Sequence, residues 1–461
     1  MMMGSTPSPR PPVAFPRLTY KAVDEHERGW LPPGGCAMTA TTLAGTQVGE
    51  SRRWRAVVAA SIGNALEWFD FIVYGFFAVT MAKLFFPTGN ETISLLLALG
   101  TFGVTFFMRP LGAIILGSYA DRYGRKSTFS LTITLMMVGT AIIVVAPTYS
   151  SIGLLAPFLI VVARMIQGFS AGGEFGSATA FLAEQNPERR GFYASWQFAS
   201  QGLTTILATA FGATLASTLT VEQMDSWGWR IPFAFGLLIG PVAYYIRRHL
   251  EETMEFRTTP VSKAPLREAL LDSKYRLLIS FGVVVLCTVG MYTVLFMPTY
   301  ATRQLGLPPV GGFLASLLTG VIQVMLIPIV GALSDRHGRL PIAFVSAATM
   351  LLAIYPMFAW LAAVPTLHTL LIVQAVMGIL LAGYMGGLAA LMSELFPTRM
   401  RTTGLSISYS FGVALFGGFA PFINAWLISA SGNKLAPSFY LMVAAVISLA
   451  ALFAARRLGM R

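Results

Sequence analysis

A ten-residue phrase occurs twice in this chain, and it constrains the fold more than any other feature. GSYADRYGRK covers residues 117–126 and GALSDRHGRL covers residues 331–340, an offset of 214 residues. Each copy lies between two long apolar runs. A short charged loop repeated once in each half of a hydrophobic chain is typical of a duplicated bundle of membrane-spanning helices.

The composition also indicates a membrane protein. Of the 461 residues, 55% are hydrophobic and only 11% are charged, whereas soluble domains carry roughly 25% charged residues. Cys36 lies in a polar tail and Cys287 in an apolar run, and the four histidines are scattered. This pattern predicts no disulfide framework, no metal site and no cofactor.

Twelve segments are long and apolar enough to cross about 30 Å of hydrocarbon, which takes about 20 residues of helix. We place them at residues 56–80, 93–117, 127–147, 152–181, 191–217, 229–247, 276–300, 311–332, 341–362, 367–392, 403–428 and 437–456. The expected fold is an all-α membrane protein with twelve transmembrane helices in two six-helix halves. An even number of spans puts both chain ends on one side of the membrane.

The positions of Lys and Arg predict which side that is. Of the 32 basic residues, 26 lie in the tails and in the loops after even-numbered spans. The other six are Lys83, Arg230, Arg303 and Lys434 in the opposite loops, and Arg109 and Arg164 inside spans. Loops rich in Lys and Arg stay in the cytoplasm. We therefore expect an inner-membrane protein with cytoplasmic termini, and no nucleic-acid partner despite the net charge of +12.

Four regions follow from this topology. Residues 1–51 are polar and rich in Pro and Gly, without the apolar core of a signal peptide, and are expected to be a disordered tail. Met38 is an alternative start of translation. We expect six-helix bundles at 52–247 and 276–461, joined by a cytoplasmic linker at 248–275. A second repeated motif, ExxPxRRG at 184–191 and ExxPxRxRxxG at 394–404, supports the duplication.

Longer phrases resemble a known family. A two-halved bundle with GxxxDRxGRK after its second span resembles the major facilitator superfamily. Within it, four phrases are similar to the metabolite–proton symporters: GNALEWFDFIVYG (63–75), MRPLGAIILGSYADRYGRK (108–126), RMIQGFSAGGEFG (164–176) and WGWRIPF (227–233). The resemblance covers about residues 52–457. That family includes permeases for citrate, α-ketoglutarate, shikimate and proline or betaine.

Three shorter stretches are most similar to the citrate and tricarballylate carriers: GAIxLGxYxDR, GFYASWQ at 191–197 and YTVLFMPTY at 292–300. The resemblance implies proton-coupled uptake of a small organic anion, citrate or a related tricarboxylate, by alternating access. Carriers of α-ketoglutarate, of shikimate or of a zwitterion such as proline or betaine are the alternatives. The chain shows no nucleophile–base pair, metal ligands or nucleotide-binding loop, so we expect no enzyme activity, and we expect a monomer.

Five charged residues lie inside predicted spans, all of them in the first half: Glu67, Asp70, Arg109, Arg164 and Glu174. Charges at this depth are costly and usually face the bundle interior. Glu67 and Asp70 are three residues apart and share one helix face near the midplane. Two carboxylates so close resist simultaneous ionisation, so we expect one of them to bind and release the coupled proton. The alternative is a structural pair neutralised by the arginines.

The two arginines are the expected anion ligands, because a buried guanidinium is a strong partner for a carboxylate. Their alternative role is in internal ion pairs. The predicted substrate-binding residues are Arg109, Arg164, Gln167, Glu174, Tyr292 and Tyr300. Further polar side chains in the spans are Gln197, Gln201, Gln323, Gln374, Tyr384 and Asn424. For each of these, and for Tyr292 and Tyr300, the alternative role is a helix–helix hydrogen bond.

The repeated loops are expected to form a cytoplasmic gate. The resemblance implies that Asp121 ties the two halves together when the transporter faces outward, here at the start of span eleven. By symmetry, Asp335 is expected to meet the start of span five near Arg189 and Arg190. The predicted gate residues are Gly117, Asp121, Arg122, Gly124, Arg125, Lys126, Asp335, Arg336, Gly338 and Arg339. Part of their role is to enforce topology, and Leu340 stands where a basic residue is common.

Overall fold

The computed structural model describes residues 40–123, 125–172, 174–249 and 273–460. The described chain is helical throughout and contains no strand. The helices that correspond to the first six predicted spans are α1 (Ala40–Phe76) with α2 (Ala78–Phe85), α3 (Glu91–Phe107) with α4 (Arg109–Tyr123), α5 (Arg125–Val145), α7 (Leu155–Ser170) with α8 (Glu174–Glu184), α9 (Arg190–Thr218) and α11 (Arg230–His249).

The last six predicted spans also each have a helix. They are α14 (Lys274–Leu305), α15 (Pro309–His337), α16 (Arg339–Ala363), α17 (Leu367–Met385) with α18 (Leu388–Leu395), α19 (Arg401–Gly412) with η5 (Val413–Gly417) and α20 (Ala420–Ser431), and α21 (Ala436–Arg457). Short elements connect several of these helices: α6 (Tyr149–Ile152), η1 (Pro187–Arg189), α10 (Val221–Gln223), η2 (Met224–Gly228) and η4 (Thr398–Met400).

Nine of the helices in the described residues are long and apolar enough to span a membrane. The three predicted spans outside this set fall on α5, α9 and α11. The apolar part of α5 is the shorter stretch Leu131–Val145. The buried face of α9 carries Ser, Thr and Gln side chains, which lower its hydropathy.

Two predicted boundaries differ from the helices of the structure. Residues 40–51 were expected to belong to the disordered tail, but they form the first part of α1 (Ala40–Phe76). We expected the first span to end at residue 80 and Lys83 to lie in a loop. Helix α1 ends at Phe76 and a separate helix α2 begins at Ala78, so Lys83 lies in the last turn of α2 and pairs with Asp225. A lysine in the last turn stabilises a helix, because its positive charge complements the carbonyl groups at the helix C-terminus.

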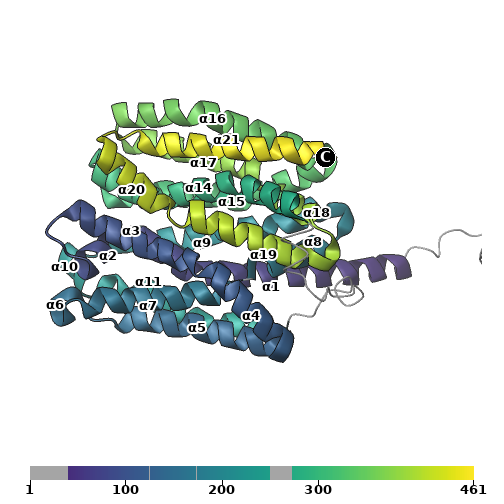
Figure 1. The fold of residues 1–461 in the computed structure, drawn as a ribbon, viewed down its shortest axis with the longest axis horizontal. Helices are drawn as coiled ribbons and strands as arrows, with labels where there is room; N and C mark the ends of the chain where they lie inside the picture. Colours follow the sequence, from purple (N-terminus) through teal and green to yellow (C-terminus); the bar gives the residue numbers. More distant parts are fainter. Residues whose placement is uncertain (1–39, 124, 173, 250–272, 461) are drawn as a thin grey trace, which may run out of the picture. The chain divides into compact units, whose positions relative to one another are not determined.

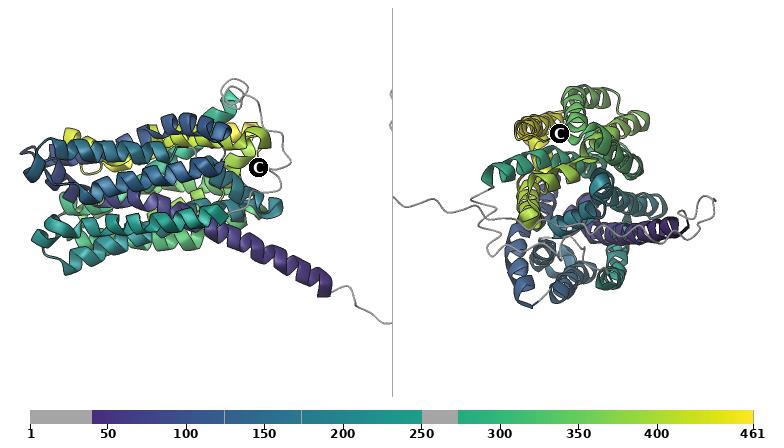
Figure 2. Two further views of the ribbon diagram at one scale, coloured as in Figure 1. Left: turned by 90° about the horizontal axis from the view of Figure 1, so that it is seen from below. Right: turned by 90° about the vertical axis from the view of Figure 1, so that its right-hand side faces the viewer.

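The helices gather in two groups. In Figure 1, α14, α16, α17 and α21 lie above α3, α5, α7 and α11, and the end-on view in Figure 2 shows the same separation. Helices α9 and α15 pack closely against each other between the groups. Gly202 and Gly320 make this contact possible, because a Cβ atom on Gly320 would lie 3.0 Å from the carbonyl oxygen of Gly202.

Candidate functional site

Arg164 lies in the middle of α7 and is fully buried. Its Nη1 donates to Gln167 Oε1 at 2.8 Å and to the main-chain oxygen of Asp70 at 3.2 Å. The guanidinium carbon stands 4.4 Å from the centre of the Tyr74 ring. Nε and Nη2 have no hydrogen-bond partner among the described residues. Among the described residues, two N–H groups of this fully buried side chain therefore remain available to a ligand.

Arg109, the first residue of α4, is arranged in the same way. It is 2% exposed, and its Nη2 donates to the main-chain oxygen of Ala171 at 3.2 Å. Its guanidinium carbon lies 4.8 Å from the centre of the Trp68 ring and 5.7 Å from that of Phe106. Nε and Nη1 have no partner among the described residues. Aromatic faces therefore hold both arginines and leave hydrogen-bond donors available.

Tyr292 on α14 reaches this region from the last six spans. Its ring packs edge-on against Phe106 at 5.2 Å and against Phe102 at 5.7 Å. The Tyr292 hydroxyl interacts electrostatically with both arginines and has no hydrogen-bond partner within the described part of the chain. The structure therefore brings Tyr292 together with Arg109 and Arg164.

A hydrogen-bond chain connects Arg164 to a carboxylate. Gln167, bound to Arg164 by its Oε1, donates through Nε2 to Thr140 Oγ1 at 2.9 Å. The Thr140 hydroxyl in turn donates to Asp70 Oδ2. Gly139 permits this arrangement, because a Cβ atom there would lie 2.6 Å from the Gln167 side chain. An internal ion pair was the alternative role for Arg164, and here two neutral side chains, Gln167 and Thr140, stand between its guanidinium group and the Asp70 carboxylate.

Thr140 was not among the predicted site residues. It lies on α5, seventy positions from Asp70, and no motif distinguishes it from the other threonines of the spans. Its hydroxyl has a second acceptor, the main-chain oxygen of Met136 at 3.0 Å. The hydroxyl hydrogen can serve only one of the two acceptors at a time.

The acidic residues share a small cavity. Glu67, Asp70 and Glu174 line it together with Thr132 and Ser170, on α1, α5, α7 and α8, and its volume is about 40 Å³. A cavity needs roughly 10–15 Å³ to hold one water molecule, so this one has room for water beside the carboxylates. The prediction that Glu67 and Asp70 share one face is confirmed. Glu174, predicted as a substrate ligand, lies with these acids.

Tyr300 does not join either group. Its hydroxyl donates to the main-chain oxygen of Lys434 at 3.0 Å, near the end of α14. Tyr384 likewise donates to the main-chain oxygen of Val283 at 2.7 Å. Tyr384 thus has the helix–helix role that was the alternative for such residues, and Tyr300 binds the turn before α21.

The second loop phrase makes the contact predicted for it. The Asp335 carboxylate accepts hydrogen bonds from the main-chain N–H groups of Gly191 at 2.7 Å and Phe192 at 3.0 Å, at the start of α9. A carboxylate is favourable at a helix N-terminus, where N–H groups lack partners. Arg339 binds the same carboxylate at 3.0 Å. This contact joins α15 to α9 across the two groups of helices.

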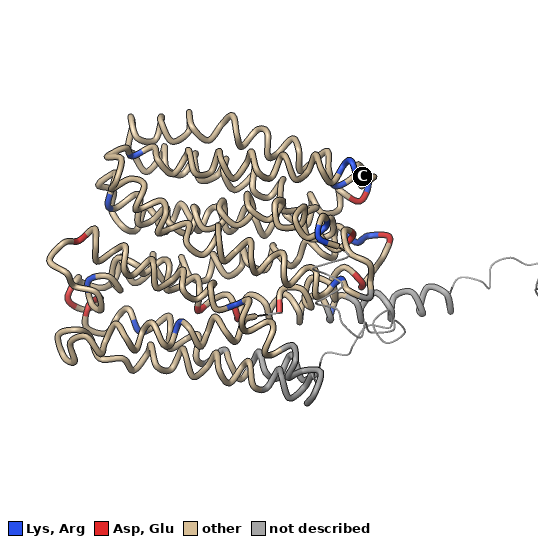
Figure 3. The backbone as a smooth tube through the Cα atoms, viewed as in Figure 1, with Lys and Arg blue, Asp and Glu red and all other residues tan. Residues whose placement is uncertain are grey.

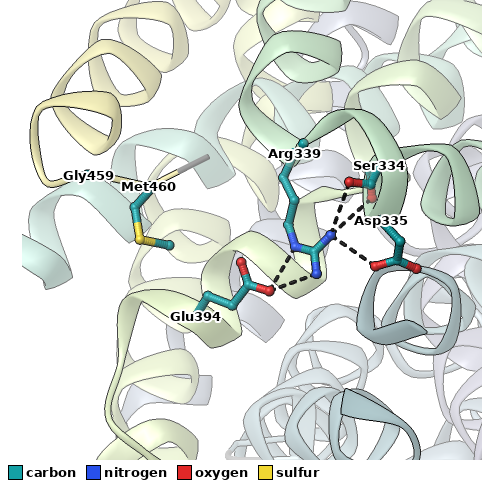
Figure 4. A pocket seen from close by; sticks show the side chains of 7 residues that line it. Ser334, Asp335, Arg339, Glu394, Gly459 and Met460 are labelled. Carbon is teal, nitrogen blue, oxygen red and sulfur yellow. Dashed lines mark hydrogen bonds and ion pairs between the residues drawn. The ribbon is translucent and has the colours of Figure 1, made fainter. Parts of the chain in front are cut away.

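Arg339 continues the network to Glu394. Its Nη2 lies 2.7 Å from Glu394 Oε1, and Figure 4 shows the arginine between Asp335 and Glu394 at the edge of a surface hollow of about 400 Å³. Arg336 is exposed, and Gly338 has a φ of +89°, which allows the turn into α16. The other predicted gate residues, Gly117, Asp121, Arg122, Gly124, Arg125 and Lys126, lie outside the described residues or have undescribed side chains.

The second repeated motif forms reciprocal ion pairs that the sequence analysis missed. Arg401 binds Glu184 at 3.0 Å, and both side chains are 7% exposed. In the opposite sense, Arg190 lies 4.0 Å from Glu394. Each glutamate of the motif therefore meets an arginine from the other copy. The repeat itself was the available signal, since two copies of a charged motif at one end of a bundle are well placed to pair.

Charged residues of the described chain lie mainly at the two ends of the helices, and a smaller set lies midway along the lower group of helices, as Figure 3 shows. At the end opposite the loop phrase, Arg303 on α14 pairs with Glu91 on α3; the Glu91 side chain is 80% exposed and that of Arg303 is 32% exposed. Phe313 fills the space beside Gly212, and Phe419 packs on Gly103. The two groups of helices are thus in contact at both ends in this structure.

Comparison with known proteins gives a consistent assignment. The family of sugar (and other) transporters matches residues 56–269 and again residues 245–456. A citrate–proton symporter of Klebsiella pneumoniae is 36% identical over 91% of this chain and 96% of its own length. A proline/betaine transporter of Escherichia coli K12 is 35% identical over 88% of this chain and 83% of its own length.

Solved structures show the same fold at low identity. A proton:xylose symporter of the major facilitator superfamily aligns with a TM-score of 0.72 at 16% identity, over 88% of this chain and 95% of the symporter. The inward-open form of a xylose transporter aligns with a TM-score of 0.63. The all-α fold with twelve membrane-spanning helices is therefore confirmed.

Proposed function

Because this chain belongs to the family of sugar and other transporters within the major facilitator superfamily, we propose that it is a proton-coupled symporter of a small organic anion. The proposed substrate is citrate or a related tricarboxylate, taken up by alternating access. The observation that carries this proposal is the pair of buried guanidinium groups, Arg109 and Arg164, whose free N–H groups lack partners among the described residues.

Carboxylates satisfy such groups best. A guanidinium binds a carboxylate through charge-assisted hydrogen bonds that are roughly twice as strong as neutral ones. Tyr292 adds a third free donor beside the arginines, from the other group of helices. An anion between these residues contacts both halves of the bundle, so its binding favours their closure around it.

The chain from Asp70 to Arg164 supplies the proposed coupling to protons. While Asp70 is ionised, its negative charge offsets that of Arg164 through Thr140 and Gln167. Protonation of Asp70 removes this compensation and leaves a buried positive charge, which is strongly unfavourable unless an anion pairs with it. Binding of the proton therefore increases the affinity for the anion, and binding of the anion increases the affinity for the proton, as symport requires. Glu67 and Glu174 border the same cavity and extend the path of the proton.

A zwitterion carrier is the competing proposal, since proline and betaine transporters are nearly as similar to this chain as citrate carriers. Binding a quaternary ammonium usually takes an aromatic cage. Here Trp68 and Phe106 surround Arg109, and Tyr74 faces Arg164. The guanidinium groups already occupy these rings and repel a second cation, which favours an anionic substrate.

We also propose that the end carrying Asp335 and Glu394 is the cytoplasmic gate. The excess of Lys and Arg in loops on this side supports that orientation, with both termini cytoplasmic. Opening towards the cytoplasm then requires Asp335 to leave the start of α9 and the pair of Arg401 and Glu184 to separate. In this proposal residues 52–247 and 276–461 are the two moving bundles, joined by residues 248–275.

The test is uptake by purified protein in proteoliposomes under an imposed inward proton gradient. Radiolabelled citrate, tricarballylate, α-ketoglutarate, shikimate and betaine are compared in parallel. We expect gradient-dependent uptake of a tricarboxylate and none of betaine. Uptake of betaine without any carboxylate would favour the zwitterion carrier, and uptake of neither would refute the proposal.

A further inference from the structure

The internal repeat places a glutamine in the last six spans at the position equivalent to each buried arginine of the first six. The offset of 214 residues between the two loop phrases relates Arg109 to Gln323. The offset of 210 residues between the two copies of the second motif relates Arg164 to Gln374. The chain thus carries a charged side chain in one half and an uncharged amide at the equivalent position in the other.

The packing of the helices supports this register. A Cβ atom on Gly168 would run into the main chain of Thr105, and a Cβ atom on Gly378 would lie 3.3 Å from the side chain of Thr319. Thr105 and Thr319 are related by the first offset, and Gly168 and Gly378 by the second. The same contact between equivalent helices therefore occurs in both halves.

Both glutamines are buried with part of their amide groups unused. Gln323 is 3% exposed and Gln374 is not exposed at all. Gln374 Nε2 donates to Ser316 Oγ at 3.3 Å, but its Oε1 has no partner among the described residues. The same holds for Gln323 Nε2. Buried polar groups are rarely left unpaired, so each unpaired atom is available to bind a ligand or a water molecule.

Gln323 lies at the contact between the two groups of helices. Its Cβ atom would be 3.1 Å from a Cβ atom on Gly202 of α9. The preceding residue of α9, Gln201, is 1% exposed, and its side chain interacts with the Tyr409 hydroxyl. A second buried amide group therefore lies beside the contact between α9 and α15.

We propose that Gln323 and Gln374 form the neutral pole of the substrate site, opposite the charged pole formed by Arg109 and Arg164. This inference rests on the proposed function. The charged pole binds ionised carboxylates, and the neutral pole binds an uncharged hydrogen-bonding group of the same molecule. An amide offers both a donor and an acceptor, which matches a hydroxyl group. The substrate class is therefore a hydroxy acid with its ionised carboxylates directed towards the arginines.

Two pairs of probes that differ only by one hydroxyl test this assignment. Citrate is compared with tricarballylate, and malate with succinate, by competition against radiolabelled citrate on the full-length protein. We expect wild-type protein to bind citrate more tightly than tricarballylate. Gln323→Leu and Gln374→Leu should each weaken citrate binding about three- to tenfold, the value of one neutral hydrogen bond, and leave tricarballylate within about twofold.

Two further variants keep the test decisive. Gln304→Leu makes the same change at the end of α14, away from both poles, and should leave both affinities unchanged. Gln374→Glu keeps the shape of the side chain and adds a negative charge, so it should weaken binding of both anions by more than about tenfold. Size-exclusion chromatography and thermal unfolding check that each variant is folded.

The outcomes separate the two proposals. Suppose that wild-type protein transports a carboxylate. If the leucine variants then weaken the binding of citrate and tricarballylate equally, or weaken the binding of neither, the two glutamines are helix–helix contacts and the neutral pole is refuted. Unchanged binding by Gln374→Glu refutes it as well. If wild-type protein binds no carboxylate at all, the proposed function itself fails, and the assignment of the glutamines fails with it.

Discussion

The two halves of this chain repeat the same helices but differ in what they carry at equivalent buried positions. The first half has Arg109 and Arg164, with acids beside them, while the second half has Gln323 and Gln374. At one end of the helices the halves are alike, since each copy of the second motif supplies a glutamate and an arginine to the other. Duplication thus preserved these ion pairs, whereas the charged residues inside the spans occur in the first half only.

The largest effect is expected from making the first half resemble the second. Arg164→Gln places in α7 the residue that α17 has at Gln374, and it removes a buried positive charge. Losing one partner of a buried charge pair costs about 2–5 kcal/mol. We expect the affinity for the transported anion to fall by at least about thirtyfold, measured as binding of radiolabelled citrate. Near-normal binding would show that the guanidinium is structural.

The second variant, Asp70→Asn, separates the proton from the anion. It keeps a hydrogen-bond acceptor for Thr140 and removes the titratable group. Proton-driven accumulation should be lost, while exchange of external for internal substrate continues, because exchange needs no net proton movement. The measurement is uptake with and without an imposed pH gradient. Full gradient-driven accumulation would transfer the proton site to Glu67 or Glu174, which border the same cavity.

A smaller effect is expected at Thr140, whose hydroxyl links Asp70 to Gln167 in the first half. Thr140→Val keeps the shape and removes the hydroxyl, whose hydrogen bond contributes about 0.5–1.5 kcal/mol. Accumulation should fall about three- to tenfold, with its pH dependence flattened. Thr140→Ser retains the hydroxyl and should behave like the wild type. Equal behaviour of the two variants would argue against the relay.

The gate variants compare the two copies of the loop phrase directly. Asp335→Asn removes the charge at the start of α9, where helix-terminus interactions are typically about 0.3–1 kcal/mol. We expect cytoplasmic accessibility, measured by labelling of introduced cysteines, to increase about two- to fivefold. Asp121→Asn is the matched change in the first copy and should act in the same direction. A wild-type rate with unchanged accessibility in both would refute the gate.

The smallest effect is expected at the opposite end. Arg303 and Glu91 form an exposed pair, and exposed pairs contribute about 0–1 kcal/mol. Arg303→Gln should therefore change the transport rate by less than about twofold in physiological salt. A larger effect would show that closure of this end depends on charge as well as on Phe313 and Phe419.

Some parts of the site were predictable because they follow from helix geometry or from the repeat. Glu67 and Asp70 lie one turn apart, so their shared cavity could be expected. The contact of Asp335 with the start of α9 followed from symmetry. Thr140 could not be identified, because its role depends on which face of α5 meets α1 and α7. Tyr300, which shared a motif with Tyr292, turned out to bind Lys434 instead.

The amino-acid sequence by itself determined the helical membrane fold, the duplication and the set of charged residues inside the spans. The bilayer imposes these, because apolar length and the high cost of buried charge can be evaluated one segment at a time. Only the tertiary structure decided which polar groups meet: that Arg164 reaches Asp70 through Gln167 and Thr140, and that Glu184 meets Arg401. Such contacts depend on how helices far apart in the chain rotate and pack against one another, and no single segment records that.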